Sequence, residues 1–91
     1  MLVTSRLAAC VQVVGPITSR YRWQGEIETT TEWLLIAKST SARADDVVAA
    51  ILDAHPYDVP EVLVMPVVGG NAAYLAWIED AVAPPSDAER A

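Results

Sequence analysis

A long alternating segment followed by a continuous apolar run constrains the fold of this chain more than any other feature. In residues 17–28, Tyr21, Trp23 and Ile27 fall on one alternating face, and polar side chains occupy the other. Strict alternation is typical of a strand with one buried face. Residues 33–37 are apolar without interruption, as in a strand that is covered on both faces. We therefore expect one long β-hairpin, with a polar turn near residues 29–31.

The first arm of this hairpin is expected to contain a bulge, and a helix is expected to follow the second arm. Residues 10–14 are rich in β-formers, and Gly15-Pro16 interrupts them. Apolar residues recur at helical spacing between residues 44 and 55, and Asp45 and Asp46 are expected in the first turn of that helix. His55 is expected to end it, because the residue before a proline disfavours the α conformation.

A third strand and a second helix complete the pattern. Residues 61–67 are apolar and β-rich, although Pro66 has no N–H to donate to a ladder. Asn71 follows two glycines and is expected to cap a helix that ends near residue 82. The order is typical of an α+β fold, in which helices cover one face of an antiparallel sheet. We expect one domain over residues 1–82 and a disordered tail over residues 83–91.

Composition limits the classes of partner and compartment. The 91 residues hold six basic and twelve acidic side chains, for a net charge of −6. An acidic chain repels nucleic acid and anionic membranes, and no apolar run is long enough to span a bilayer. A single cysteine excludes an intrachain disulfide, so we expect a reducing cytoplasm. A three-stranded sheet is thin for 53% apolar residues, and its open edges favour a homo-oligomer.

Several separate motifs, in the same order and at the same spacing, resemble the signature of the CutA divalent-cation tolerance proteins. They lie at residues 6–11 (RLAACV), 18–27 (TSRYRWQGEI), 32–38 (EWLLIAK), 55–61 (HPYDVPE) and 71–78 (NAAYLAWI). The resemblance implies a ferredoxin-like antiparallel sheet and a trimer similar to that of the PII signalling proteins. It further implies a non-enzymatic role in tolerance to copper and other divalent cations, since some members bind copper. Animal members are linked to acetylcholinesterase maturation.

The chain departs from this family at its N-terminus. Members begin with a strand and a helix before the motif at residues 6–11, and only the last turns of that helix fit here. The missing strand is an inner strand of the ferredoxin-like sheet, so its absence leaves ladder hydrogen bonds unmade on its neighbours. Our explanation is a start codon assigned too far downstream.

Cys10 and His55 are the candidate metal ligands, because copper favours thiolate and imidazole. A homotrimer supplies three of each, so a weak site for Cu(II) or another divalent cation can form between subunits. Two simpler interpretations remain open. Cys10 is also explained as a small buried side chain in a strand, and His55 as a helix-terminal residue near the last carbonyls.

A second candidate site is a ligand cleft between subunits. The loop of residues 55–61 is stiffened by two prolines, and Lys38 is the only lysine in the chain. The resemblance to PII-like trimers implies that Lys38, His55, Tyr57 and Glu61 can meet there and receive a small ligand. Lys38 is alternatively explained by an ion pair with Glu61 or another acidic residue. Tyr21 and Trp23 are expected at the trimer interface.

Three functions follow from these residues. The first is a metal-tolerance protein that binds a cation or small ligand at subunit clefts. The second is a structural trimer that holds a partner protein. The third, and weakest, is an enzyme that uses Cys10 and His55, which would need the thiol activated by an adjacent base.

Overall fold

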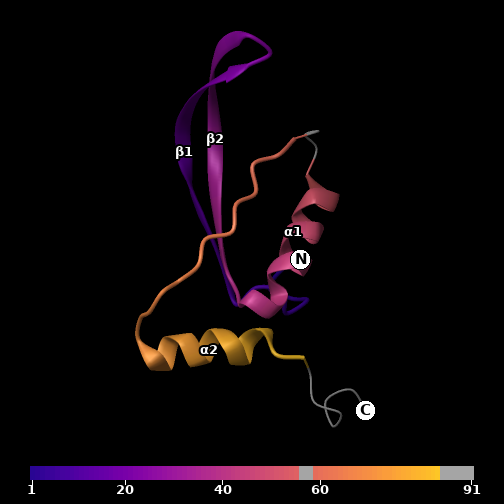
Figure 1. The fold of residues 1–91 in the computed structure, drawn as a ribbon, viewed down its shortest axis with the longest axis vertical. Helices are drawn as coiled ribbons and strands as arrows, with labels where there is room; N and C mark the ends of the chain where they lie inside the picture. The colour runs from indigo at the N-terminus through magenta and orange to yellow at the C-terminus, as the bar shows by residue number, and fades with distance from the viewer. Residues whose placement is uncertain (56–58, 85–91) are drawn as a thin grey trace.

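Two long antiparallel strands form the sheet in a computed structural model of the chain, which describes residues 1–55 and 59–84 (Figure 1). Strand β1 spans Cys10–Trp23 and strand β2 spans Glu26–Lys38. They pair from Cys10 opposite Lys38 at the base of the hairpin to Trp23 opposite Glu26 at its tip. The expected hairpin is confirmed, and its second arm is longer than the apolar run suggested.

The hairpin turns at Gln24 and Gly25, so the turn expected at residues 29–31 was wrong. Both residues have positive φ, 49° for Gln24 and 82° for Gly25. This conformation is that of a two-residue type I′ turn, which glycine adopts at no steric cost. Residues 29–31 are three threonines. Threonine is polar, but its β-branched side chain favours a strand, and these residues continue β2.

The bulge expected in the first arm is confirmed. Val14 pairs with Leu34 and Ile17 pairs with Glu32, so β1 contains one residue more than β2 across Gly15-Pro16. Because successive side chains point to opposite faces, the extra residue exchanges the faces of all later β1 residues relative to the earlier ones.

Helix α1 spans Ser41–Ala54 and rises beside the hairpin (Figure 1). It ends where the sequence predicts, because His55 is extended and its N–H donates to the carbonyl oxygen of Ile51 at 2.9 Å. Its first turn contains no acidic residue. The expected dipole contacts of Asp45 and Asp46 were therefore wrong, because the helix starts a full turn before them.

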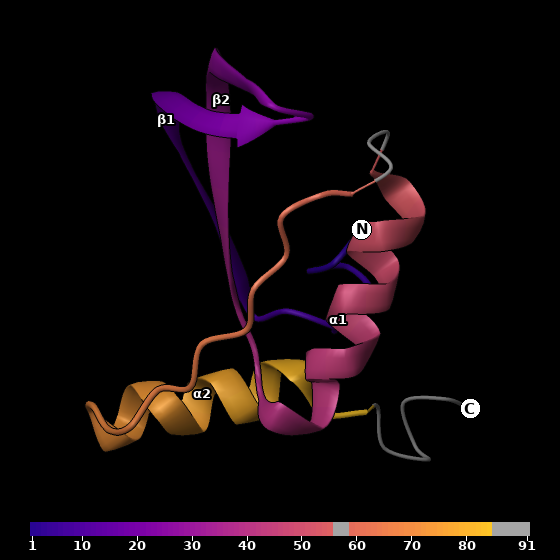
Figure 2. The ribbon, with the colours of Figure 1, turned by 45° about the horizontal axis from the view of Figure 1, so that its top comes forward.

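Helix α2 spans Ala72–Val82 and crosses the base of the hairpin (Figure 2). Asn71 caps it as predicted. Its side-chain oxygen accepts hydrogen bonds from the backbone N–H of Ala73 at 2.9 Å and of Tyr74 at 3.4 Å. The helix ends at Val82, and residues 85–91 of the expected tail lie outside the described residues.

Residues 60–71 form neither helix nor strand, so the strand expected at residues 61–67 was wrong. The sheet of the described chain contains only β1 and β2. A strand requires a neighbour for its ladder of hydrogen bonds, and neither β1 nor β2 supplies one to this segment. Val62 is half-buried, and the apolar side chains that follow it are exposed, namely Leu63, Val64, Met65, Val67 and Val68.

The buried apolar core of the described residues is small. It comprises Ala8, Val47 of α1, and Ile78 and Val82 of α2. The accessible surface is 7397 Å², whereas a compact monomer of this mass exposes about 5,200 Å². Within this single chain the expected burial of residues 33–37 on both faces is not observed, since Trp33 is 62% exposed. Among the described residues, β1 is the strand that pairs with β2, and no third strand covers Trp33.

Within residues 1–55 and 59–84, no helix has both the length and the apolar character required to cross a membrane.

Candidate functional site

Cys10 lies at the base of the hairpin, where β1 begins. It is a free thiol of intermediate exposure, paired in the ladder with Lys38. The backbone around it is well anchored, because the Ala9 N–H donates to the carbonyl oxygen of Lys38 at 2.8 Å. The thiol is therefore held in place at the end of the sheet that α2 crosses (Figure 2).

His55 lies at the opposite end of α1 from this base. The helix begins three residues after Lys38 and continues for 14 residues, or about 20 Å at 1.5 Å per residue. The structure therefore does not bring Cys10 and His55 together within one copy. The described residues also contain no group of three or more His, Cys, Asp or Glu side chains that could hold a metal ion. One copy alone does not fit a metal centre.

Lys38, a member of the expected ligand cleft, contacts helix α2 through its side chain. Its Nζ donates a hydrogen bond to the Tyr74 hydroxyl at 3.2 Å and lies 5.4 Å from the centre of the Tyr74 ring. Tyr74 stacks in turn on Trp77, with ring centres 5.6 Å apart. These contacts bring a cation and two half-exposed aromatic rings together at the base of the hairpin.

Tyr74 was not predicted as the partner of Lys38. An ion pair with Glu61 or another acid was expected instead, whereas the ion pair found within residues 1–55 and 59–84 joins Arg43 to Asp46. One signal was available, because a tyrosine on an apolar helix face usually needs a partner for its hydroxyl. Glu61 is exposed at the start of the extended segment, and Tyr57 lies outside the described residues.

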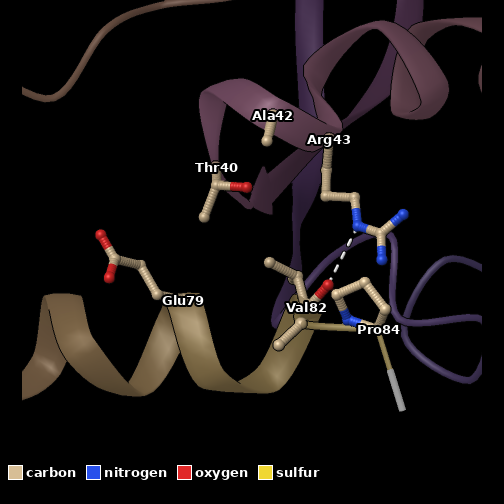
Figure 3. A pocket seen from close by; sticks show the side chains of 7 residues that line it. Thr40, Ala42, Arg43, Glu79, Val82 and Pro84 are labelled. Atoms are coloured by element: carbon tan, nitrogen blue, oxygen red, sulfur yellow. Dashed lines mark hydrogen bonds between the residues drawn. The ribbon is translucent and has the colours of Figure 1, made fainter. Parts of the chain in front are cut away.

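A cavity of about 470 Å³ lies between the start of α1 and the end of α2 (Figure 3). Thr40, Ala42 and Arg43 line one side, and Glu79, Val82 and Pro84 line the other. The guanidinium of Arg43 is engaged there, because its Nε donates to the Val82 carbonyl oxygen at 2.9 Å. Arg43 thus joins the end of α2 to the start of α1 and satisfies a terminal carbonyl.

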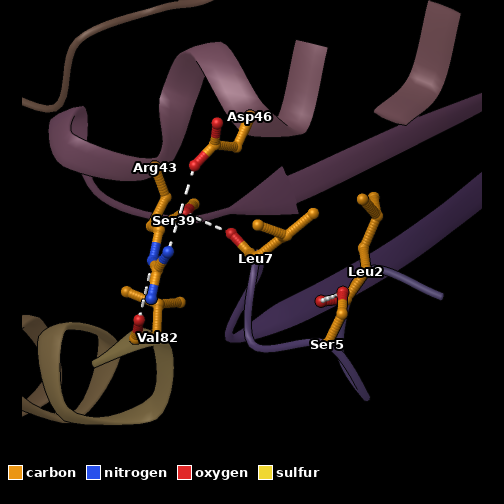
Figure 4. A network of polar contacts seen from close by, with 7 residues as sticks. All are labelled: Leu2, Ser5, Leu7, Ser39, Arg43, Asp46 and Val82. Atoms are coloured by element: carbon orange, nitrogen blue, oxygen red, sulfur yellow. Dashed lines mark hydrogen bonds and ion pairs between the residues drawn. The ribbon is translucent and has the colours of Figure 1, made fainter. Parts of the chain in front are cut away.

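Two further polar contacts fix the N-terminal segment against this junction, and Figure 4 shows the one between Ser39 and Leu7. The Ser39 hydroxyl donates to the Leu7 carbonyl oxygen at 2.6 Å, and the Arg6 Nη1 donates to the Ala83 carbonyl oxygen at 3.4 Å. The contact of Arg43 with Asp46 is longer, at 3.9 Å, and lies at an exposed carboxylate. These contacts hold the two helices and residues 1–9 together as one unit.

Tyr21 and Trp23, the expected interface residues, lie near the tip of the hairpin. They are 39% and 44% exposed, although both are large aromatic side chains. The strands touch each other along their whole length, and the tip stands away from both helices (Figures 1 and 2). In a single copy, neither helix of the described chain covers these aromatic side chains.

Comparison with known proteins identifies relatives of this chain. The family model described as CutA1 divalent ion tolerance protein matches residues 1–81. A Xenopus laevis protein named "Protein CutA homolog" is 43% identical over 81 residues, which are 89% of this chain and 54% of that protein. The chain thus spans about half the length of that relative.

Two solved structures share the fold. The divalent cation tolerance protein of Thermus thermophilus superposes with a TM-score of 0.86 at 41% identity, over 90% of this chain and 80% of that one. A protein from Nostoc, described as the PII-like protein CutA, superposes with a TM-score of 0.84 at 27% identity, over 90% and 80% of the two chains. The expected α+β class and PII-like likeness are confirmed by these neighbours.

Proposed function

This chain belongs to the CutA1 divalent ion tolerance protein family, and on that premise we propose that it acts in divalent-cation tolerance without catalysing a reaction. It binds a divalent cation, Cu(II) in our proposal, or a small ligand where copies of the chain meet. The match of the family model to residues 1–81 is the observation that supports this proposal most directly. It includes both strands, helix α1, all of α2 except its last residue, and both candidate metal ligands.

The proposal places the cation between copies because one copy does not provide enough ligands. Cys10 and His55 lie at opposite ends of α1, and the described residues contain no cluster of three candidate ligands. A homotrimer presents three thiols and three imidazoles, and copper favours both groups. The free thiol of Cys10 is consistent with a reducing cytoplasm.

The shape of the single chain supports a homo-oligomer. Its radius of gyration is 16.1 Å, whereas a compact chain of 91 residues has a radius of about 12 Å. Its surface exceeds that of a compact monomer by an amount comparable to a protein interface. Large apolar side chains on β2 and on residues 63–68 account for part of this excess.

A small-ligand cleft is the second part of the proposal. Lys38 is already fixed beside Tyr74, so it presents a positioned cation at the base of the hairpin. A neighbouring copy would have to supply His55 and Glu61, because in one copy these residues lie beyond the far end of α1.

Titration of the chain with Cu(II), followed by calorimetry and native mass spectrometry, tests the proposal. We expect a trimer that binds copper, and a loss of roughly tenfold or more in affinity in the Cys10→Ala/His55→Ala double variant. Met65→Leu is the matched control, because it removes a thioether, another soft ligand, from a position that is 82% exposed. Unchanged copper affinity in the double variant would exclude Cys10 and His55 as the ligands.

A protein that acts only as a scaffold would give a different result in this experiment. A trimer that serves only to hold a partner protein would not bind copper specifically. Its assembly would also be unchanged by the Cys10→Ala and His55→Ala substitutions.

A further inference from the structure

Helix α2 carries two stacked aromatic rings where it crosses the base of the hairpin (Figure 2). The planes of the Tyr74 and Trp77 rings are inclined by 29°, and their centres lie 5.6 Å apart. Tyr74 is 42% exposed and Trp77 is 48% exposed, so both rings keep open surface in the single chain. These two residues and Lys38 are here called the aromatic shelf.

The Lys38 ammonium is positioned on this shelf and has donors to spare. Its Nζ lies 3.2 Å from the Tyr74 hydroxyl oxygen and 5.4 Å from the centre of the Tyr74 ring. An ammonium has three N–H donors, and this hydrogen bond uses one of them. The Tyr74 hydroxyl accepts the bond and keeps its own proton to donate. Two donor atoms thus lie 3.2 Å apart, close enough to bind the two oxygens of one carboxylate.

The charges around the aromatic shelf favour an anion that carries a single charge. A second cation is disfavoured, because the ammonium of Lys38 already lies over the Tyr74 ring. A polyanion is disfavoured as well, because the chain has a net charge of −6 and α2 continues from Trp77 with Glu79 and Asp80. A single carboxylate satisfies both restrictions.

We propose that the aromatic shelf binds a planar aromatic monocarboxylate. The carboxylate accepts hydrogen bonds from the Lys38 Nζ and the Tyr74 hydroxyl. The aromatic ring of the ligand stacks on Trp77, since the face of Tyr74 is already occupied by Lys38. This inference rests on the small-ligand part of the proposed function, with which it shares Lys38, and it names the class of ligand.

Calorimetric titration of the native assembly with three probe compounds tests the class of ligand. The probe 2-naphthoate is planar and anionic, 2-naphthylmethanol is planar and neutral, and cyclohexanecarboxylate is anionic without an aromatic ring. We expect 2-naphthoate to bind roughly tenfold more tightly than either of the others, because each of those lacks one of the two kinds of contact. Equal affinities for the three probes, or no binding of 2-naphthoate, would overturn the inference.

Substitutions on the aromatic shelf test each contact separately. Lys38→Met should weaken the binding of 2-naphthoate roughly tenfold or more, and Tyr74→Phe, which keeps the ring, about threefold or more. Arg22→Met is the matched control for Lys38→Met, since it removes the same charge from an exposed position near the hairpin tip. We expect the control to bind as wild type does. Equal weakening by Lys38→Met and Arg22→Met would show that net charge alone governs binding and would overturn the site.

Trp77→Leu tests the stacking contact. We expect it to weaken the binding of 2-naphthoate about threefold to tenfold. Its affinity for cyclohexanecarboxylate should stay at the wild-type value, which an unfolded variant would not retain. Unchanged affinity for 2-naphthoate would exclude Trp77 as the stacking partner and overturn the proposed arrangement.

Failure of this inference and failure of the proposed function give different results. A trimer that binds copper but not 2-naphthoate would overturn the aromatic shelf as a ligand site and leave the metal proposal intact. An assembly that binds 2-naphthoate but not copper would overturn the metal proposal and support the shelf.

Discussion

The indole ring of Trp33 lies against Gly15 so closely that no side chain fits between them. A Cβ atom on Gly15 would come within 2.6 Å of Trp33 Cε3 and 2.9 Å of Cδ2, and within 3.2 Å of the Glu32 carbonyl oxygen. The bulge of β1 at Gly15 and the indole ring of Trp33 on β2 thus pack directly against each other. The glycine at this position is required by its neighbour.

We expect Gly15→Ala to lower the free energy of unfolding by about 1–3 kcal/mol, because the methyl group displaces the ring or the strand. Urea unfolding followed by circular dichroism measures this change. Gly69→Ala is the matched control, since no atom lies within 4 Å of its added Cβ. We expect the control to be neutral or slightly stabilising. Equal stability of Gly15→Ala and wild type would contradict the fit described above.

A substitution in the hairpin turn is expected to raise the free energy of unfolding. Gln24 has a φ of 49°, which asparagine adopts more readily than glutamine does. Gln24→Asn should therefore stabilise the chain by about 0.5 kcal/mol. The same substitution at Gln12, which lies in the regular part of β1, should be neutral or destabilising, because asparagine disfavours strands. Thermal unfolding of both variants checks the difference in sign.

The two helix N-caps differ and should respond differently to alanine. Asn71 accepts two backbone hydrogen bonds at the start of α2, whereas the Thr40 side chain makes no capping hydrogen bond at the start of α1. Asn71→Ala should destabilise the chain by about 1 kcal/mol. Thr40→Ala should lower the free energy of unfolding by clearly less than Asn71→Ala does. If chemical denaturation shows equal losses, the cap geometry of α2 is not what stabilises that helix.

Arg43 should stabilise the chain through its hydrogen bond to Val82 and very little through its contact with Asp46. Its hydrogen bond to the Val82 carbonyl oxygen is 2.9 Å long and partly buried, whereas the contact with Asp46 is 3.9 Å long and exposed. We expect Arg43→Gln to cost about 1–2 kcal/mol, since the terminal carbonyl of α2 loses its donor. Asp46→Asn should change stability by less than about 0.5 kcal/mol. The reverse ranking in urea unfolding would refute this assignment.

The sequence predicted the features that depend on a few adjacent residues. The bulge at Gly15-Pro16, the end of α1 at His55 and the cap at Asn71 all follow from local backbone chemistry. The turn was expected at residues 29–31 because those residues are polar. The better signal was Gly25, since glycine adopts the positive φ that the turn requires.

Features that depend on distant residues could not be predicted in the same way. Residues 61–67 have the composition of a strand, but a ladder also needs a neighbour, and local composition does not report one. The contact between Lys38 and Tyr74 joins side chains 36 positions apart. The separation of Cys10 from His55 likewise depends on the direction in which α1 leaves the sheet, which no local pattern specifies.

The turn at Gln24–Gly25 also has a consequence for the order in which the chain folds. Trp23 and Glu26 are close in sequence and can pair early, whereas Cys10 and Lys38 enclose the longest loop of the ladder and pair last. Both helices dock at that last-formed end, where Ser39 reaches Leu7. We therefore expect substitutions near the tip to change mainly the folding rate, and substitutions near the base to change mainly the unfolding rate.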